Sequence, residues 1–230
     1  MSILADAART VRQMPGPRMR GPVLKGVLTT LAAIVGLAVT LGAWITSLLD
    51  GVTIPWTDIP LAGAGGVLAG AGSLAAAWFV FIPAAALVVS FFIDGVAGAV
   101  EAKHWPQAGP GRDRALSLDL WISVKAAALA LVVNLPLIPF YFLFPPLPAF
   151  VNGVLLGREY FLLSALRHHP MPEAKALRRR ATLAVVLGGA IFALLATIPL
   201  LNLVAPVFGA GLMTHAYNRT RERSGAAVAF

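Results

Sequence analysis

The sequence predicts an all-α integral membrane protein with two long transmembrane helices, two re-entrant (hemi-penetrating) helical hairpins and an N-terminal amphipathic helix. Of its 230 residues, 58% are hydrophobic and only 12% are charged, whereas a soluble domain has about 45–50% apolar and about 25% charged residues. Prolines interrupt some of the apolar stretches, and the basic residues flank them. Four stretches contain no Asp, Glu, Lys or Arg: Gly26–Leu49, Ile59–Ile93, Ala126–Gly157 and Ala181–Asn218.

The N-terminal residues 1–14 predict a short amphipathic helix. Small and large apolar residues recur at helical spacing, and Asp6, Arg9 and Arg12 lie on the other side. A helix of this kind either is solvated or lies in the membrane interface, and arginines beside small apolar residues favour the interface. The apolar residues are Ile3, Leu4, Ala7, Ala8, Val11 and Met14.

The first two uncharged stretches predict the long helices. A spanning helix needs about 20 apolar residues, so the first stretch predicts a transmembrane helix over 22–49. The second predicts a loop followed by a helix over 66–102, which exceeds the hydrocarbon thickness at about 1.5 Å per residue. Its end would protrude from the bilayer and carry Asp94, Glu101 and Lys103.

The third stretch is broken at its centre by a cluster of prolines that follows Asn134. Because a helix interior tolerates proline poorly, the arms Ala126–Leu135 and Ala149–Gly157 are each about half a bilayer long. The simplest geometry is a re-entrant hairpin over 115–169, with its irregular tip buried in protein or facing a water-filled cavity. The prolines are Pro136, Pro139, Pro145, Pro146 and Pro148.

The fourth stretch repeats this design over 174–223. Pro199, Asn202 and Pro206 interrupt it, and its longer arms form either a second hairpin or two barely spanning helices, with length favouring the hairpin. If both hairpins return to their starting side, all basic clusters share one face, which the positive-inside rule makes cytoplasmic. The N-terminus is then cytoplasmic as well.

The sequence contains no recognisable catalytic constellation, so we expect no enzyme activity and no cofactor. Spacings typical of zinc proteases, P-loops or serine hydrolases are lacking, and the absence of cysteine excludes disulfides and Cys-based metal centres. The net charge of +8 does not indicate nucleic-acid binding, because the basic residues flank apolar runs and are not interleaved with stacking aromatics. It fits lipid head groups instead.

The start of the first long helix is a candidate anion site. Helix N-termini attract anions, and the basic residues there add positive charge. An ordinary positive-inside flank explains the same residues and is favoured by that rule alone. The candidate set is Gly16, Pro17, Arg18, Arg20 and Lys25.

Several polar residues lie inside the apolar stretches and are either pore-lining or structural. Ionisable residues at membrane depth are functional candidates, yet Glu159 could equally pair with a nearby arginine. For Thr214 and His215, hydrogen bonding between helices is favoured over pore lining. The His168-His169 pair is expected to be solvated. The full set is Asn134, Asn152, Arg158, Glu159, Tyr160, Asn202, Thr214 and His215.

Two motifs resemble the etoposide-induced-protein superfamily, which includes the CysZ sulfate permeases. One is Asn152-Gly-Val-Leu-Leu-Gly-Arg-Glu-Tyr160 with Ala165-Leu-Arg-His168, and the other is Ile198-Pro-Leu-Leu-Asn-Leu-Val-Ala-Pro206 leading to Met213-Thr-His215. Pro15-Gly-Pro-Arg18 is similar to the family's Gly-Leu-Arg turn, with Pro17 in place of Leu and Met19 where the permeases tend to have a second Arg.

This resemblance implies a bacterial inner-membrane protein with two long spanning helices and two hemi-penetrating hairpins, assembled as a homo-oligomer. It also implies passive, cofactor-free sulfate uptake, with Gly16, Pro17 and Arg18 in the sulfate-binding turn. We therefore expect an anion channel or permease that supplies sulfate for assimilation, with a non-transporting scaffold or envelope-maintenance protein of the same fold as the alternative.

Overall fold

The computed structural model describes residues 2–49, 94–112, 116–144, 146–198, 201 and 204–225, and these residues are helical or connect helices. Most of the helix predicted over 66–102 lies outside the described residues, which include only its end, a helix over residues 94–104. The labelled elements are α1 (Ile3–Gln13), α2 (Pro17–Leu49), η1 (Pro106–Ala108), α4 (Leu116–Asn134), η2 (Leu135–Leu137), α5 (Ile138–Leu143), α6 (Pro146–Ala165), α7 (Met171–Arg180), α8 (Thr182–Ala196) and α10 (Ala205–Ser224).

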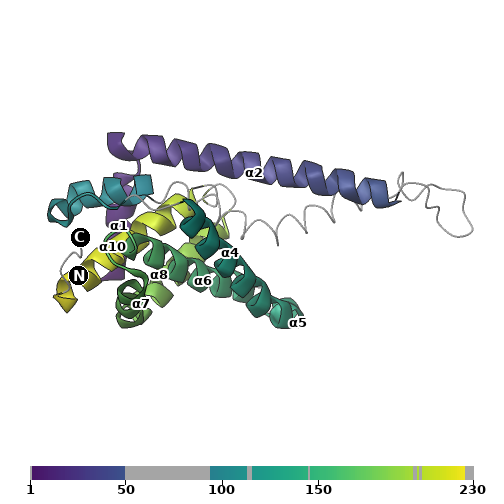
Figure 1. The fold of residues 1–230 in the computed structure, drawn as a ribbon. Helices are drawn as coiled ribbons and strands as arrows, with labels where there is room; N and C mark the ends of the chain where they lie inside the picture. The colour runs from purple at the N-terminus through teal and green to yellow at the C-terminus, as the bar shows by residue number, and fades with distance from the viewer. Residues whose placement is uncertain are drawn as a thin grey trace, which may run out of the picture.

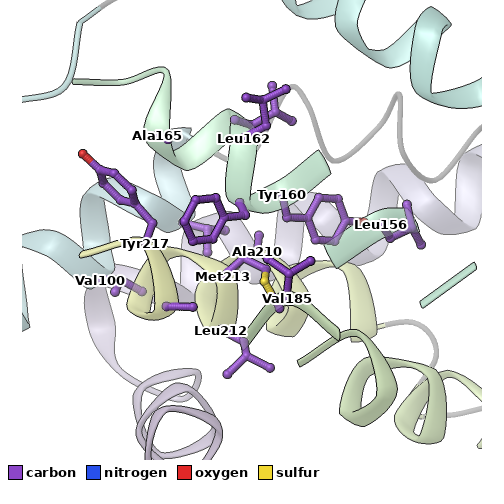
Figure 2. Packing of buried hydrophobic residues seen from close by; sticks show 14 of the residues in the cluster. Val100, Leu156, Tyr160, Leu162, Ala165, Val185, Ala210, Leu212, Met213 and Tyr217 are labelled. Carbon is purple, nitrogen blue, oxygen red and sulfur yellow. The ribbon is translucent and has the colours of Figure 1, made fainter. Parts of the chain in front are cut away.

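Helix α10 is the centre of the bundle. Every residue from Ala205 to Asn218 in it is buried, and it contacts α1, α2, α6, α7 and α8. Tyr160 and Leu156 from α6, Val185 from α8 and Met213 from α10 meet in one hydrophobic cluster (Figure 2). A helix that is buried on all sides needs neighbours around it, so α10 fixes where the other helices pack.

Helices α6 and α8 approach each other closely because glycines face each other at their crossing. A Cβ atom on Gly153 would lie 2.4 Å from the Gly189 carbonyl oxygen, and one on Gly189 would lie 2.7 Å from the Gly153 carbonyl oxygen. Gly157, one turn on, faces the Val185 carbonyl oxygen in the same way, at 3.1 Å. Small residues spaced four apart permit this kind of backbone contact between membrane helices.

Helix α1 packs on the bundle with its polar side. Asp6, Thr10 and Gln13 are buried, whereas Leu4 is 68% and Val11 is 54% exposed. The Gln13 amide donates to the Ala99 carbonyl oxygen at 2.7 Å, and Asp6 forms an ion pair with Arg219. Ile3 is buried in the core, and Ala7 and Met14 pack against it, so the outward apolar side is formed by residues such as Leu4 and Val11. Exposed apolar side chains of this kind are costly in water but suited to a lipid interface.

Helix α2 has 33 residues and is therefore about 50 Å long. Its first turns pack on the bundle through Met19, which is fully buried, and through Gly26, whose Cβ would lie 2.8 Å from Val207 Cγ2. The rest of α2 projects beyond the packed helices (Figure 1). Leu24, Leu28, Leu31, Val35 and Val39 are exposed along it.

The prolines of the third apolar stretch interrupt it, as expected, since α4 ends at Asn134, but helical segments continue beyond the arm that was expected to end at Leu135. Pro136 and Pro139 are the second residues of η2 and α5, and Pro146 begins α6. Proline lacks an N–H group, and at a helix start none is needed. The helical path therefore extends to Leu143, and the chain reverses between α5 and α6.

Among the described residues, the helical segment Val124–Tyr141 is long and apolar enough to cross a bilayer. Helices α7 and α8, which are bent by 79° relative to each other, would provide a second crossing if the pair is counted as one span. Helices α1 and α7 lie at one end of the bundle and α5 at the other (Figure 1). The division into spanning helices and re-entrant hairpins stays a prediction from the sequence.

The glycine crossing can be tested by adding single methyl groups. We expect Gly153→Ala to destabilise the protein by about 1–3 kcal/mol, the usual cost of overpacking, because the new Cβ overlaps the backbone of α8. The control is Gly36→Ala in α2, where a Cβ meets nothing within 4 Å and helix propensity is improved. Melting temperatures in detergent measure both, and equal midpoints for the two variants would contradict the crossing.

Candidate anion site at the start of helix α2

The start of α2 is held firmly by a tight turn after α1. The Gly16 amide donates to the Gln13 carbonyl oxygen at 2.8 Å, and the Gly16 carbonyl oxygen accepts from the amides of Met19 and Arg20, both at 3.0 Å. A Cβ on residue 16 would lie 2.9 Å from the Gln13 carbonyl oxygen, so glycine suits this position. Pro17 follows as the first residue of α2.

A cavity of about 440 Å³ lies beside this turn. The exposed Arg18 borders it from α2, Glu101 borders it from the helix over 94–104, and Arg167 borders it from the segment that follows α6. Helix N-termini favour anions, and the cavity brings two guanidinium groups, those of Arg18 and Arg167, close to the N-terminus of α2. The remaining lining residues are Gly98, Ala102, Trp105, Pro106, Gly109 and Pro110.

Arg167 is fixed in place by two carboxylates. Its Nη1 donates to Asp94 Oδ1 at 2.6 Å, and its Nε donates to Glu101 Oε2 at 3.3 Å. A Cβ on Gly111 would lie 2.7 Å from the guanidinium carbon, so the chain passes directly against this group. Asp94 and Glu101 are seven residues apart and therefore share one face of their helix.

Glu101 is the centre of a buried polar network. It is 3% exposed, and besides Arg167 it contacts His168 Nε2 at 3.0 Å and accepts from Asn218 Nδ2 at 3.3 Å. Burial by itself would raise the pKa of the Glu101 carboxyl, but the hydrogen bond with His168 and the charge of Arg167 outweigh it. The result is a pKa below the usual 4.5, so this carboxylate stays charged at neutral pH.

The expectation that His168 and His169 are solvated is wrong. Their exposed fractions are 1% and 3%, and the His168 ring stacks on Tyr217 with 6.1 Å between ring centroids. His169 Nδ1 lies 3.1 Å from Glu173 Oε2. The pair is buried because the chain turns sharply after α6 and packs both rings against α10.

The structure brings together only part of the predicted anion set. Arg18 lines the cavity beside the Gly16-Pro17 turn. The Arg20 side chain instead donates to the Pro15 carbonyl oxygen at 3.0 Å, and Lys25 is exposed on α2 and does not line the cavity. The buried Met19 explains why a second arginine would not fit at that position.

Asn134 and Asn152 form a reciprocal amide pair between α4 and α6. Each side-chain Nδ2 donates to the other's Oδ1 at 2.9 Å, and each also donates to a carbonyl oxygen of its own helix. The Tyr141 hydroxyl donates to Asn134 Oδ1 as well. These amides satisfy one another and hold the two helices together.

The remaining predicted polar residues lie in different places. Arg158 and Glu159 line a separate cavity between α4, α6 and α7, and Tyr160 is buried with its ring edge-on to Phe192. The Thr214 hydroxyl lies 3.0 Å from Ser164 Oγ and so links α10 to α6. His215 is fully buried beside Trp105. Asn202 lies outside the described residues.

Sequence reasoning missed the network around Glu101. Its signal was present in the seven-residue spacing of Asp94 and Glu101, and in the Arg167-His168 dipeptide that follows an apolar helix. The pairing itself joins residues 66 and 117 positions apart in the chain. No helical periodicity relates positions so distant.

A sequence model of the family described as sulfate transporter CysZ/etoposide-induced protein 2.4 matches residues 6–206 of this chain. The match confirms the resemblance predicted from the motifs, and it includes the start of α2, residues 94–112 and Arg167. No curated protein and no solved structure matches the chain.

The lowered pKa of Glu101 predicts a stability that depends on pH. A carboxyl whose pKa is lower in the folded state contributes stability above its unfolded value, and this contribution is lost as the pH falls through the folded value. We therefore expect the melting temperature of the wild type to fall as the pH drops below about 4.5.

The variant Glu101→Gln should have a lower melting temperature at pH 7 and a flatter profile in acid. The exposed Glu222→Gln provides the matched control and should follow the wild type. A Glu101→Gln profile parallel to that of the wild type in acid would contradict the assignment.

Proposed function

This chain belongs to the sulfate transporter CysZ/etoposide-induced protein 2.4 family, a membrane family of transporters, and from that premise we propose that it is a passive anion channel or permease. Sulfate is the first candidate substrate. The proposed location is the bacterial inner membrane, and the proposed working unit is a homo-oligomer surrounded by membrane lipids.

The observation that carries this proposal is the meeting of Arg18 and Arg167 at one cavity. Two guanidinium groups and one carboxylate, Glu101, line it, so its side-chain charge is positive. The Glu101 carboxylate is already engaged by His168, Arg167 and Asn218. Positively charged rings and rims favour anions over cations in pores.

The two arginines have different roles in this proposal. Arg18 is exposed, and its N-terminal position on α2 adds the partial positive charge of the helix end. Arg167 is 7% exposed and held by Asp94 and Glu101. Arg18 therefore attracts an anion from solution, and Arg167 presents a fixed guanidinium face at the back of the cavity. Because the Nη1 and Nε donors of Arg167 are taken by these carboxylates, Arg167 contributes its charge. Arg18 is the arginine whose planar guanidinium group offers paired N–H donors to a tetrahedral oxyanion.

The proposed arrangement in the membrane places this cavity on the cytoplasmic side. In this arrangement helix α2 and the helix predicted over 66–102 cross the bilayer, and the pairs α4–α6 and α8–α10 enter it and return. The basic ends of these elements then share the cytoplasmic face, as the positive-inside rule requires. The reciprocal Asn134–Asn152 pair supports this arrangement, because it satisfies polar groups at the deep end of the first hairpin.

A non-transporting scaffold of the same fold is the second candidate function. The observation that favours it is that several polar residues predicted to be either pore-lining or structural take part in hydrogen bonds between helices. The Asn134–Asn152 pair and the Ser164–Thr214 contact join helices, which is a structural role. A scaffold would need no anion at Arg18.

The transport proposal predicts that Arg18→Gln weakens sulfate binding at least about tenfold. Loss of a charge-assisted hydrogen bond costs about 1.5–3 kcal/mol, and each 1.4 kcal/mol is a factor of ten in affinity. Binding is measured by isothermal titration in detergent, and transport by sulfate flux into proteoliposomes. Arg12→Gln on α1, an exposed residue that does not line the cavity, is the control.

Both measurements have outcomes that would reject the proposal. Sulfate flux no greater than in empty liposomes, from a sample with a normal melting temperature, would leave the scaffold as the remaining candidate. Equal sulfate affinity for Arg18→Gln and Arg12→Gln would remove Arg18 from the binding site.

A further inference from the structure

A second cavity, of about 190 Å³, lies between α4, α6 and α7, away from the proposed anion site. Four basic residues surround it from three elements: Lys125 on α4, Arg158 on α6, and Lys175 and Arg178 on α7. Glu159 is the one carboxylate among its lining residues. The lining therefore has an excess of three positive charges at neutral pH.

The same cavity has an apolar side. Trp121 and Leu129 of α4 line it and are exposed by 57% and 40%. Leu155 and Leu156 of α6 continue this apolar wall. The site is thus a basic pocket that opens onto an exposed apolar helix face.

The four basic residues of the cavity outnumber its one lining carboxylate, Glu159. Burial, followed by the charges of Arg158 and Arg179, lowers the pKa of the Arg178 guanidinium. The Lys125 ammonium lies 4.6 Å from the centre of the Trp121 ring, a cation–π contact at the outer edge of the pocket. An anionic group placed between these cations would relieve their mutual repulsion.

We propose that this cavity binds an anionic phospholipid, with its phosphate among Lys125, Arg158, Lys175 and Arg178 and an acyl chain along Trp121 and Leu129. Charge complementarity selects the head group, and the exposed apolar face of α4 accommodates the chain. Basic pockets beside membrane helices are suited to anionic head groups, and tryptophan prefers the depth at which head groups meet acyl chains.

The position of the cavity along the hairpin agrees with this occupant. Asn134 and Asn152 are bonded near the α5 end of the α4–α6 pair, and α5 lies at the opposite end of the bundle from α7 (Figure 1). The basic pocket adjoins α7, and Trp121 lies between three and four turns before Asn134 on α4. Asn152 lines the inner end of the cavity. In the proposed arrangement the amide pair is therefore at its deep end, and the four basic residues are at head-group level on the cytoplasmic face.

The test compares lipid binding to the wild type and to the double variant Lys175→Gln/Arg178→Gln. The purified full-length protein is titrated in mild detergent with phosphatidylglycerol or with phosphatidylcholine of the same chains, and retained lipid is counted by native mass spectrometry. The control is Arg179→Gln, which removes one positive charge from an exposed residue of α7 that does not line the cavity.

We expect the wild type and Arg179→Gln to retain one phosphatidylglycerol in preference to phosphatidylcholine, and the double variant to bind it at least tenfold more weakly. At about 1 kcal/mol per basic residue, the loss of two residues corresponds to about 30-fold. The melting temperature of each variant without lipid establishes that it is folded.

Three outcomes would overturn the proposal. Equal retention of both lipids would show that the basic residues do not select a head group. A preference for phosphatidylglycerol that is unchanged in the folded double variant would place the lipid elsewhere. Competition by millimolar inorganic phosphate or sulfate, with full displacement of the lipid, would make the cavity a site for small anions.

Discussion

The buried ion pair between Glu101 and Arg167 is the interaction on which the functional end of this protein depends. It joins the helix over 94–104 to the turn after α6, and through Asn218 it reaches the central helix α10. A buried pair of charges stabilises a structure only when further hydrogen bonds satisfy both groups. Asp94, His168 and Asn218 supply those bonds here. Removing Glu101 would leave Arg167 with Asp94 alone and would take away the carboxylate that His168 and Asn218 contact, so the cavity beside Arg18 depends on the whole network.

The network can form only because the helices beneath it approach closely. Gly153 and Gly189 bring the backbones of α6 and α8 into contact, and Gly209 of α10 makes room for the rings of Phe192 and Tyr160. The packed helices in turn fix the turn after α6, where His168 stacks on Tyr217. Gly111 then passes against the Arg167 guanidinium, where any side chain would displace it. Small residues thus set the distances between the helices, and the polar network can form only at those distances.

Much of the helical content could be predicted from the sequence, because apolar length and charge position are local properties. The family was also correctly predicted, since its motifs are contiguous runs such as residues 152–160. What the sequence could not show is which polar residues meet. Arg20 turned to the Pro15 carbonyl oxygen instead of the cavity, and the histidine pair was buried, not solvated. The prolines after Asn134 were read as helix breakers, whereas they begin new helical segments. Each of these outcomes depends on contacts between distant residues or on where a helix starts, and hydropathy records neither.

The surroundings of the positively charged side chains explain why this fold can have two anion sites of different kinds. Arg167 and Arg219 are paired with buried carboxylates, so they contribute structure and a fixed guanidinium face. Arg18 and the cations around the second cavity point to spaces where carboxylates are fewer than cations. At the start of α2 the lining combines Arg18, Arg167 and Glu101 with small residues, prolines and Trp105, which suits a hydrated oxyanion. Between α4 and α7 the surroundings are apolar on one side, so an anion bound there gains most if it carries a hydrocarbon chain, at about 0.8 kcal/mol per buried methylene. Both sites have an excess of positive charge. The apolar surface beside the second cavity therefore makes that cavity suited to a lipid, whereas the first is suited to anions from water.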